Sequence, residues 1–521
     1  MQLSETRGPR LLPVVVVMLG LIFAFHLGGA RLGKPLYRAS HLGTALEYGH
    51  GSINLLRPVI VGFNATGTPT ALELPVWQAA AGLAFKVAHS TWYGWANLVS
   101  LLFFSTCLWP FFQLARQYVG RRAAGWAVAF FLAEPLIVMM AGEAATDGLC
   151  LTAMLWFVFF ADKMIRTGNA WWWWPATLLA VLSALLKAPL FFAAGLFTLC
   201  LLLVNGAGAW RPWVLLSSAG AAAVCAFALW TRYTNRLAAQ AIYPYTELRL
   251  SQSPWLVHWF FGDMHYRLTP GPWLKGGWRF LHATMGTLPM SALLALALLR
   301  PGNRLPKLWL LAALPTTLIF THLVLEHWHF YLMCAPAVAM LCGATLARWE
   351  DFWARETPMP ALRTALAAMV LVFSALDGLI ITKVAGDYDY FPQQMSAEIL
   401  RHTGPGDRLL VYTCDPLWGG EVLFRSGRKG LCVPILEGGP NGPTPKGLFD
   451  LLSNQSDLDR LKSLGYNKLV LISESPVRYV VAASNPGSKR IRARYPDKLP
   501  AGANAWPEVC RTEDILIKTI P

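Results

Sequence analysis

The chain has 521 residues, of which 55% are apolar and only 14% are charged, and its mean hydropathy is +0.42. Soluble globular proteins usually carry about 25% charged residues, so this composition excludes an ordinary soluble protein. The net charge of +15 does not indicate a nucleic-acid-binding protein, because many of the Lys and Arg residues lie in short gaps between apolar runs rather than on one basic face. The sequence predicts a polytopic α-helical membrane protein.

Apolar runs recur along the first three quarters of the chain. A helix needs about 20 apolar residues to cross the hydrocarbon core of a bilayer. Such runs are centred near residues 20, 102, 131, 155, 179, 197, 222, 292, 315, 338 and 373. The runs near 131 and 155 are short, and the run near 197 follows that near 179 almost without a gap. We therefore predict a bundle of about 11 transmembrane helices over residues 1–383.

The distribution of Lys and Arg between the runs predicts the orientation in the membrane. Short cytoplasmic loops are enriched in these residues. With a cytoplasmic N-terminus, every loop assigned to the inside contains at least one of them, beginning with Arg116, Arg121 and Arg122. Two long segments, 29–91 and 232–285, then lie on the outer side. Residues 384–521 are also predicted to lie outside, in the periplasm if the cell is Gram-negative, and the protein is expected in the bacterial inner (cytoplasmic) membrane.

Residues 384–521 change in character. Strand-like runs at Leu409–Tyr412, Leu469–Ile472 and Ile515–Ile517 alternate with a helical run over 448–464 that ends at Gly465. This alternation predicts a small α/β domain. The nine cysteines form no metal-binding spacing motif, and a pairing of Cys414 with Cys432 would leave Cys510 over. No nucleotide-binding Gly-rich loop occurs in the sequence.

Ionisable side chains gather at the outer ends of the predicted spans, whereas the spans themselves are nearly free of them. This pattern predicts a cleft at the outer membrane surface rather than a path through the bundle. A lipid-linked substrate could enter such a cleft from the side. The candidates are His41, Glu47, Glu73, Glu143, Asp147, Lys187, Arg249, Arg267, His327, His329 and, beside them, Tyr331.

Three of these positions have both a structural and a functional interpretation. Asp147 begins an apolar run, where it can cap a helix or bind a substrate or a divalent cation. Lys187 lies between two apolar runs, where it can extend to the interface or bind a phosphate. The histidines of Glu326-His-Trp-His329 belong either to an interfacial polar belt or to the cleft.

The order of these elements resembles the GT-C superfamily of polyprenyl-phosphate-sugar glycosyltransferases, in the branch of the protein O-mannosyltransferases and the lipid A aminoarabinose transferase. The elements are Tyr37-Arg-Ala-Ser-His41, Leu56-Arg-Pro58, Glu73-Leu-Pro75, Thr146-Asp147, Lys187-Ala-Pro189 and His327-Trp-His-Phe-Tyr-Leu-Met-Cys-Ala-Pro336, over about residues 10–350. The resemblance implies a GT-C-like bundle and inverting transfer of a hexosyl or pentosyl group from a polyprenyl-phosphate donor. The acceptor would be a lipid, a glycan or a protein.

The resemblance also implies roles for individual residues. His41 stands where the family usually has the acidic base, so His41, Glu47 or Glu73 would remove the proton of the acceptor. Lys187 would bind the donor phosphate with Arg249 or Arg267, and Asp147 would bind substrate or, if a metal takes part, a divalent cation. The substitution at His41 leaves a non-catalytic protein open as an alternative. A transport protein for lipid-linked sugars is a separate alternative.

Overall fold

The computed structural model describes residues 11–31, 39–58, 73–206, 210–239, 254–286, 288–356, 365, 368–377, 379–380, 391–413, 422–423, 425–434, 455–472, 505–511 and 515–521. The chain divides into two compact units. Unit 1 comprises Met1–Gly28, Tyr93–Arg232 and Val257–Gly386, and unit 2 comprises Gly29–Trp92, Tyr233–Leu256 and Asp387–Pro521. The first long outer segment, 29–91, thus groups with the C-terminal part. The predicted boundary at 383/384 lies outside the described residues.

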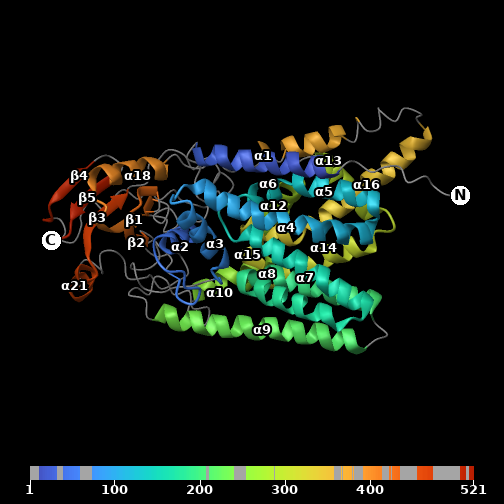
Figure 1. Cartoon of the computed structure of the whole chain (residues 1–521), viewed down its shortest axis with the longest axis horizontal. Coiled ribbons are helices and arrows are strands. Elements are labelled where there is room, and N and C mark those ends of the chain that lie inside the picture. Colours follow the sequence, from blue (N-terminus) through green and yellow to red (C-terminus); the bar gives the residue numbers. More distant parts are fainter. Residues whose placement is uncertain are drawn as a thin grey trace. The chain divides into compact units, whose positions relative to one another are not determined.

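Unit 1 is a bundle of helices (Figure 1). Its long helices are α1 (Leu11–Arg31), α4 (Tyr93–Val119), α5 (Arg121–Ala133), α7 (Asp147–Thr167), α8 (Trp173–Asn205), α9 (Trp210–Ala239), α13 (Leu288–Leu299), α14 (Arg304–Ile319) and α16 (Ala335–Glu356). Shorter helical segments connect them: α6 (Pro135–Ala141), η1 (Ala170–Trp172), α10 (Pro254–Phe261), α11 (Met264–Leu268), α12 (Pro270–Phe280), η3 (Leu281–Met285), α15 (Thr321–Glu326) and η4 (Trp328–Met333).

Each predicted apolar run falls within a helix, although the runs do not all form separate spans. The runs near 179 and 197 both lie in α8, which consists of two helical segments joined across a kink at Lys187. By length and composition, four helices of the described residues can cross a membrane: α4, α7, α8 together with η1, and α9. The number rises to six if α5 with α6, bent by 66°, and α12 and η3 with α13, bent by 105°, each form one span. The predicted number of about 11 transmembrane helices is therefore not confirmed among the described residues.

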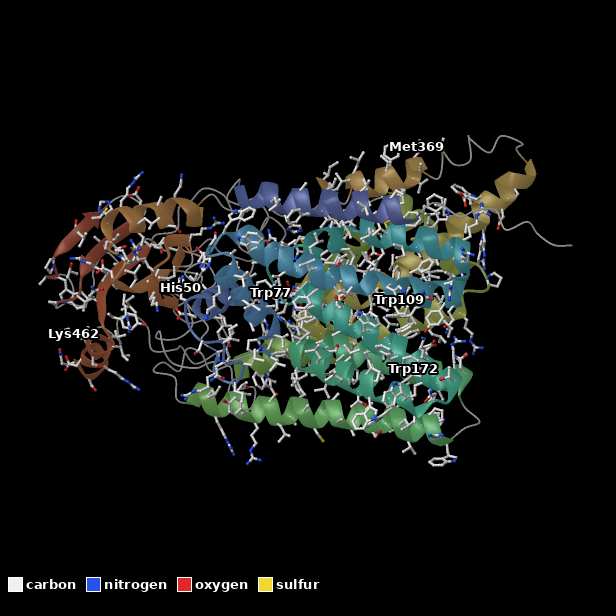
Figure 2. All side chains as sticks on the ribbon, in the orientation of Figure 1. His50, Trp77, Trp109, Trp172, Met369 and Lys462 are labelled. Carbon is white, nitrogen blue, oxygen red and sulfur yellow. The ribbon has the colours of Figure 1, made fainter. Side chains whose placement is uncertain are left out.

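The outer surface of the bundle is apolar. Only 17% of the most apolar stretch of α9 is buried inside the protein, and side chains such as Val224 and Leu229 are exposed. Trp109, labelled in Figure 2 together with Trp172, is exposed and stacks on Trp156 with 5.4 Å between ring centroids. So much apolar surface is unfavourable in water and stable in lipid. Unit 1 therefore has the surface of a membrane protein.

Small residues allow close helix packing inside the bundle. A Cβ atom added to Gly343 of α16 would lie 2.5 Å from the backbone nitrogen of Ala127 in α5, so only glycine fits at this contact. Without a hydrophobic driving force in lipid, helices associate through such close van der Waals contacts. Helix α7 packs against α4 and α8, and α8 also packs against α14. These contacts fix the N-terminus of α7 beside the kink of α8.

Unit 2 contains helices α2 (Ala39–His50) and α3 (Val76–Val87), which pack together, and a five-stranded sheet in the C-terminal part. The sheet order is β2-β1-β3-β5-β4, with β1 parallel to β2 and β3, and β5 antiparallel to β3 and β4. The three predicted strands lie within β1, β3 and β5, and the described part of the predicted helix is α21. The bounds are β1 (Arg408–Thr413), β2 (Lys429–Pro434), β3 (Tyr466–Ile472), β4 (Glu508–Arg511), β5 (Ile515–Thr519), α18 (Phe391–His402) and α21 (Gln455–Ser463).

Candidate active site

A buried ion pair joins two of the predicted site residues. Lys187 Nζ donates a hydrogen bond to Asp147 Oδ1, and the side chains of the two residues are 4% and 0% exposed. Asp147 is the first residue of α7, and Lys187 lies at the kink of α8 with extended backbone angles. Pro189 lacks a backbone N–H, so the helix loses a hydrogen bond next to this kink. The pairing shows that Asp147 does more than cap α7.

Segment η4 contacts this ion pair and connects it to α12. The ammonium group of Lys187 lies 5.3 Å from the ring centroid of Phe330. The neighbouring Tyr331 donates a hydrogen bond from its hydroxyl to the carbonyl of Gly276, at 2.8 Å. A Cβ atom at Gly276 would lie 2.4 Å from Leu325 Cδ2, so a larger residue there would displace the Leu325 side chain where α12 approaches α15. Tyr331 thus belongs to the framework of the site.

Glu326, the last residue of α15, is the centre of a second charged group. Its carboxylate contacts Lys275 Nζ at 3.1 Å and Arg279 Nη1 at 2.8 Å, and it accepts a hydrogen bond from the Tyr266 hydroxyl at 2.9 Å. Burial alone would raise the pKa of Glu326. The hydrogen bond and charge of Arg279, with the hydrogen bonds of Tyr266 and Lys275, nevertheless lower that pKa to about 2. This carboxylate is therefore ionised at neutral pH.

Aromatic and histidine rings lie beside Glu326. The rings of His258 and Tyr266 lie 5.0 and 4.9 Å from that of His322, and His327 lies 4.7 Å from Trp259 and 5.5 Å from His329. Burial lowers the pKa of His322, so this ring is neutral at pH 7. Flat rings with a few polar groups line many pockets for organic ligands. The ring of Trp259 lies 5.5 Å from that of His322, so the predicted His327 and His329 belong to the same group of rings.

Of the two arginines predicted to bind the donor phosphate, the structure describes only Arg267. Arg267 donates to the carbonyl oxygen of Phe261 at 2.7 Å and of Ile319 at 3.1 Å, so its guanidinium connects α11 to the ends of two other helices. Arg249 lies outside the described residues. Glu143 is buried in the turn between α6 and α7, at 7% exposure.

The predicted base candidates lie in unit 2. His41, on α2, accepts a hydrogen bond at Nδ1 from the side-chain amide of Gln78 at 2.7 Å, and its ring lies 6.3 Å from that of Trp77. Glu47 Oε2 lies 3.8 Å from Lys429 Nζ of β2, and Glu73 is half-buried just before α3.

The overall fold is similar to that of solved glycosyltransferases. No protein-family model and no curated protein matches the sequence. The fold nevertheless matches ArnT from Cupriavidus metallidurans bound to undecaprenyl phosphate, with a TM-score of 0.58, 13% identity and 98% of each chain covered. The apo state of that ArnT matches with a TM-score of 0.56, 13% identity, and coverage of 97% of this chain and 98% of that chain. The chain has the GT-C glycosyltransferase fold.

A larger GT-C structure matches as well. The arabinofuranosyltransferase AftD from Mycobacteria, as its R1389S mutant, matches with a TM-score of 0.50 and 15% identity, and the match covers 100% of this chain and 42% of that chain. The present chain thus matches less than half of that protein. It matches ArnT along almost its whole length, unit 2 included.

Three side chains of the candidate site were not predicted from the sequence: Tyr266, Lys275 and Arg279. A signal was present, because Lys275 and Arg279 are four residues apart in the segment 232–285 and therefore face the same side of a helix. The sequence does not indicate which residue is their common partner. Glu326 lies about fifty residues further along the chain, and only the packing of α12 against α15 brings the three together.

Proposed function

We propose that this protein transfers a sugar from a polyprenyl-phosphate donor to a lipid, glycan or protein acceptor. The observation that carries the proposal is the buried pair of Asp147 and Lys187, in a fold that it shares with ArnT bound to undecaprenyl phosphate. An ammonium group is costly to bury, and a site for an anion is one reason to keep it there. Asp147 uses one of the three N–H donors of Lys187, and the other two can bind phosphate oxygens.

The proposed reaction is an inverting displacement. An acceptor oxygen forms a bond to the anomeric carbon of the sugar as the bond from that carbon to the phosphate oxygen breaks, and the acceptor proton passes to a base. Negative charge then develops on the departing phosphate, where Lys187 stabilises it. His41, Glu47 and Glu73 are the candidate bases. Asp147 already balances the charge of Lys187, so no step through a metal ion at this carboxylate is proposed.

The function is tested with purified protein in liposomes that contain defined undecaprenyl-phosphate sugars and a mixture of lipid, glycan and peptide acceptors. We expect a labelled sugar to leave the carrier and appear in one acceptor class. Binding of undecaprenyl phosphate without transfer to any acceptor would favour the non-catalytic alternative. Movement of the labelled carrier across the bilayer without transfer would favour a transport protein.

The pH dependence of transfer tests His41 as the base. We expect transfer to rise with pH through roughly 6–7, because a histidine accepts a proton only when its ring is neutral. The rise should be absent in His41→Ala and present in Glu73→Gln. His41→Asp should keep measurable transfer, with the rise moved to lower pH. If His41→Ala follows the parent over the whole pH range, the base is to be sought at Glu47 or Glu73.

We further propose that the N-terminus is cytoplasmic and that the part of the chain after residue 384 is periplasmic, in the inner membrane of a bacterium. A reporter that is active only in the cytoplasm, fused after Pro521, should therefore stay silent. The same reporter inserted at Gly168, in the exposed turn after α7, should be active, because that turn follows Lys163 and Arg166. Activity of the C-terminal fusion would contradict this topology.

A further inference from the structure

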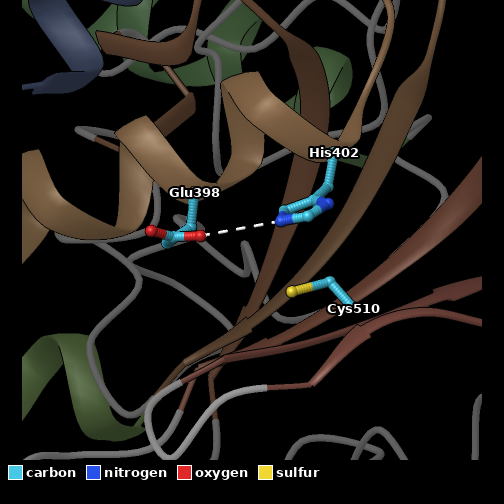
Figure 3. A group of neighbouring side chains, drawn as sticks. All are labelled: Glu398, His402 and Cys510. Carbon is cyan, nitrogen blue, oxygen red and sulfur yellow. Dashed lines mark ion pairs between the residues drawn. The ribbon is translucent and has the colours of Figure 1, made fainter.

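Three side chains with metal-binding atoms lie together in the C-terminal part of unit 2 (Figure 3). Glu398 and His402 are one turn apart on α18, and Cys510 lies on β4. One ligand atom from each residue lies within 4.8 Å of the other two. Glu398 Oε2 and His402 Nε2 are 3.7 Å apart. Cys510 is distant from Glu398 and His402 in the sequence, so no spacing motif indicates the cluster.

The packing of α18 on the sheet fixes this arrangement. Met395 and Ile399 of α18 belong to the same apolar core as Ile515 and Ile517 of β5, and Cys510 packs against that core. Residues four apart lie on one face of a helix, so Glu398 and His402 project together beside the core. Their side chains are 24% and 35% exposed, so an ion can reach them from solvent.

The distances suit a small tetrahedral ion. Zinc bonds of about 2.0–2.3 Å place the ligand atoms of a tetrahedral site roughly 3.3–3.8 Å apart. The Glu398 and His402 atoms already have this separation, and the sulfur of Cys510 lies within 4.8 Å of a ligand atom of each. The other carboxylate oxygen of Glu398 accepts a hydrogen bond from Arg401 at 2.5 Å, which orients the carboxylate.

The chemistry of the three groups selects the class of ion. Carboxylate, imidazole and thiolate together favour zinc and related transition-metal ions over calcium or magnesium, which prefer oxygen ligands alone. We propose that Glu398, His402 and Cys510 form a binding site for a divalent transition-metal ion of the zinc type. The ion cross-links α18 to β4, which lies at the edge of the sheet among the strands that the structure describes. This role is independent of sugar transfer.

Cobalt provides a direct probe, because a thiolate bound to Co²⁺ gives a charge-transfer absorption that carboxylate and imidazole ligands do not. The full chain, without a histidine tag, is treated with a chelator in detergent and titrated with Co²⁺. We expect one equivalent to produce this absorption and Zn²⁺ to abolish it. Cys510→Ser should remove the absorption, and His402→Gln should weaken Co²⁺ binding at least about tenfold.

Cys225→Ser is the matched control, because Cys225 is an exposed thiol on α9 and is not one of the three residues of the cluster. This variant should keep the absorption and the affinity of the parent. Melting curves without metal verify that each variant is folded, and Zn²⁺ should raise the melting temperature of the parent but not that of His402→Gln. Absence of the absorption in the folded parent, or its persistence in Cys510→Ser, would overturn the proposal.

Discussion

Asp147→Asn should lower sugar transfer at least about tenfold, equivalent to 1.4 kcal/mol of barrier, and it should also destabilise the protein. The second effect follows from burial. Asparagine leaves the ammonium of Lys187 without its counter-charge, and breaking a buried ion pair from one side costs about 3–5 kcal/mol. Lys187→Met should have a comparable cost, because it leaves the Asp147 carboxylate buried beside an apolar side chain.

The double variant Asp147→Asn/Lys187→Met distinguishes the two effects. It leaves no uncompensated charge, so its unfolding free energy should exceed that expected from the sum of the single changes by about 3–5 kcal/mol, the cost of one unpaired buried charge. Transfer should be lost in the double variant as well, because the ammonium is gone. Thermal unfolding in detergent and transfer per folded molecule are the two measurements. Strictly additive stability changes would contradict a coupled pair.

Asp162→Asn is the matched control for this experiment. Asp162 is a buried aspartate on the same helix α7, near its other end, and it accepts hydrogen bonds from Gln117, Tyr118 and Arg166. Its replacement should also destabilise the protein, because it removes a buried charged partner. Transfer per folded molecule should remain that of the parent. If Asp147→Asn and Asp162→Asn lose transfer equally, the effect of the Asp147 change is on folding alone.

Glu326→Gln should destabilise the protein by about 1–3 kcal/mol at pH 7. The lowered pKa of Glu326 means that its charge stabilises the folded state, and the partial exposure of its partners limits the size of this contribution. The folded pKa of about 2 lies below the unfolded value of 4.5. The stability that the Glu326 charge contributes is therefore fully present above pH 4.5 and is lost as the pH falls through 2. The difference in unfolding free energy between parent and variant should shrink over that range.

An exposed carboxylate serves as the control for Glu326. Asp351 pairs with Arg122 but its side chain is 59% exposed, so Asp351→Asn should change the unfolding free energy by at most about 1 kcal/mol. Denaturant unfolding at pH 7 and at several lower values measures both variants. A Glu326→Gln difference that stays constant down to pH 2 would show that packing, rather than charge, is lost.

The sequence alone determined the elements that depend on local pattern. Each apolar run lies in a helix, and the alternating runs of the tail lie in β1, β3 and β5. Burial of apolar side chains and the repeat of helix and strand are encoded by neighbouring residues, so one stretch of sequence is enough to predict them. The order of the polar elements likewise indicated the GT-C fold before any contact was known.

Tertiary structure decided which charged groups are partners. Lys187 and Asp147 were both predicted as site residues, but only the packing of α7 against the kinked α8 pairs them. The meeting of Lys275 and Arg279 with Glu326 likewise depends on helices that are distant in sequence. An ionic contact needs atoms within a few ångströms, and that proximity is set by the packing of whole elements, which no local spacing contains.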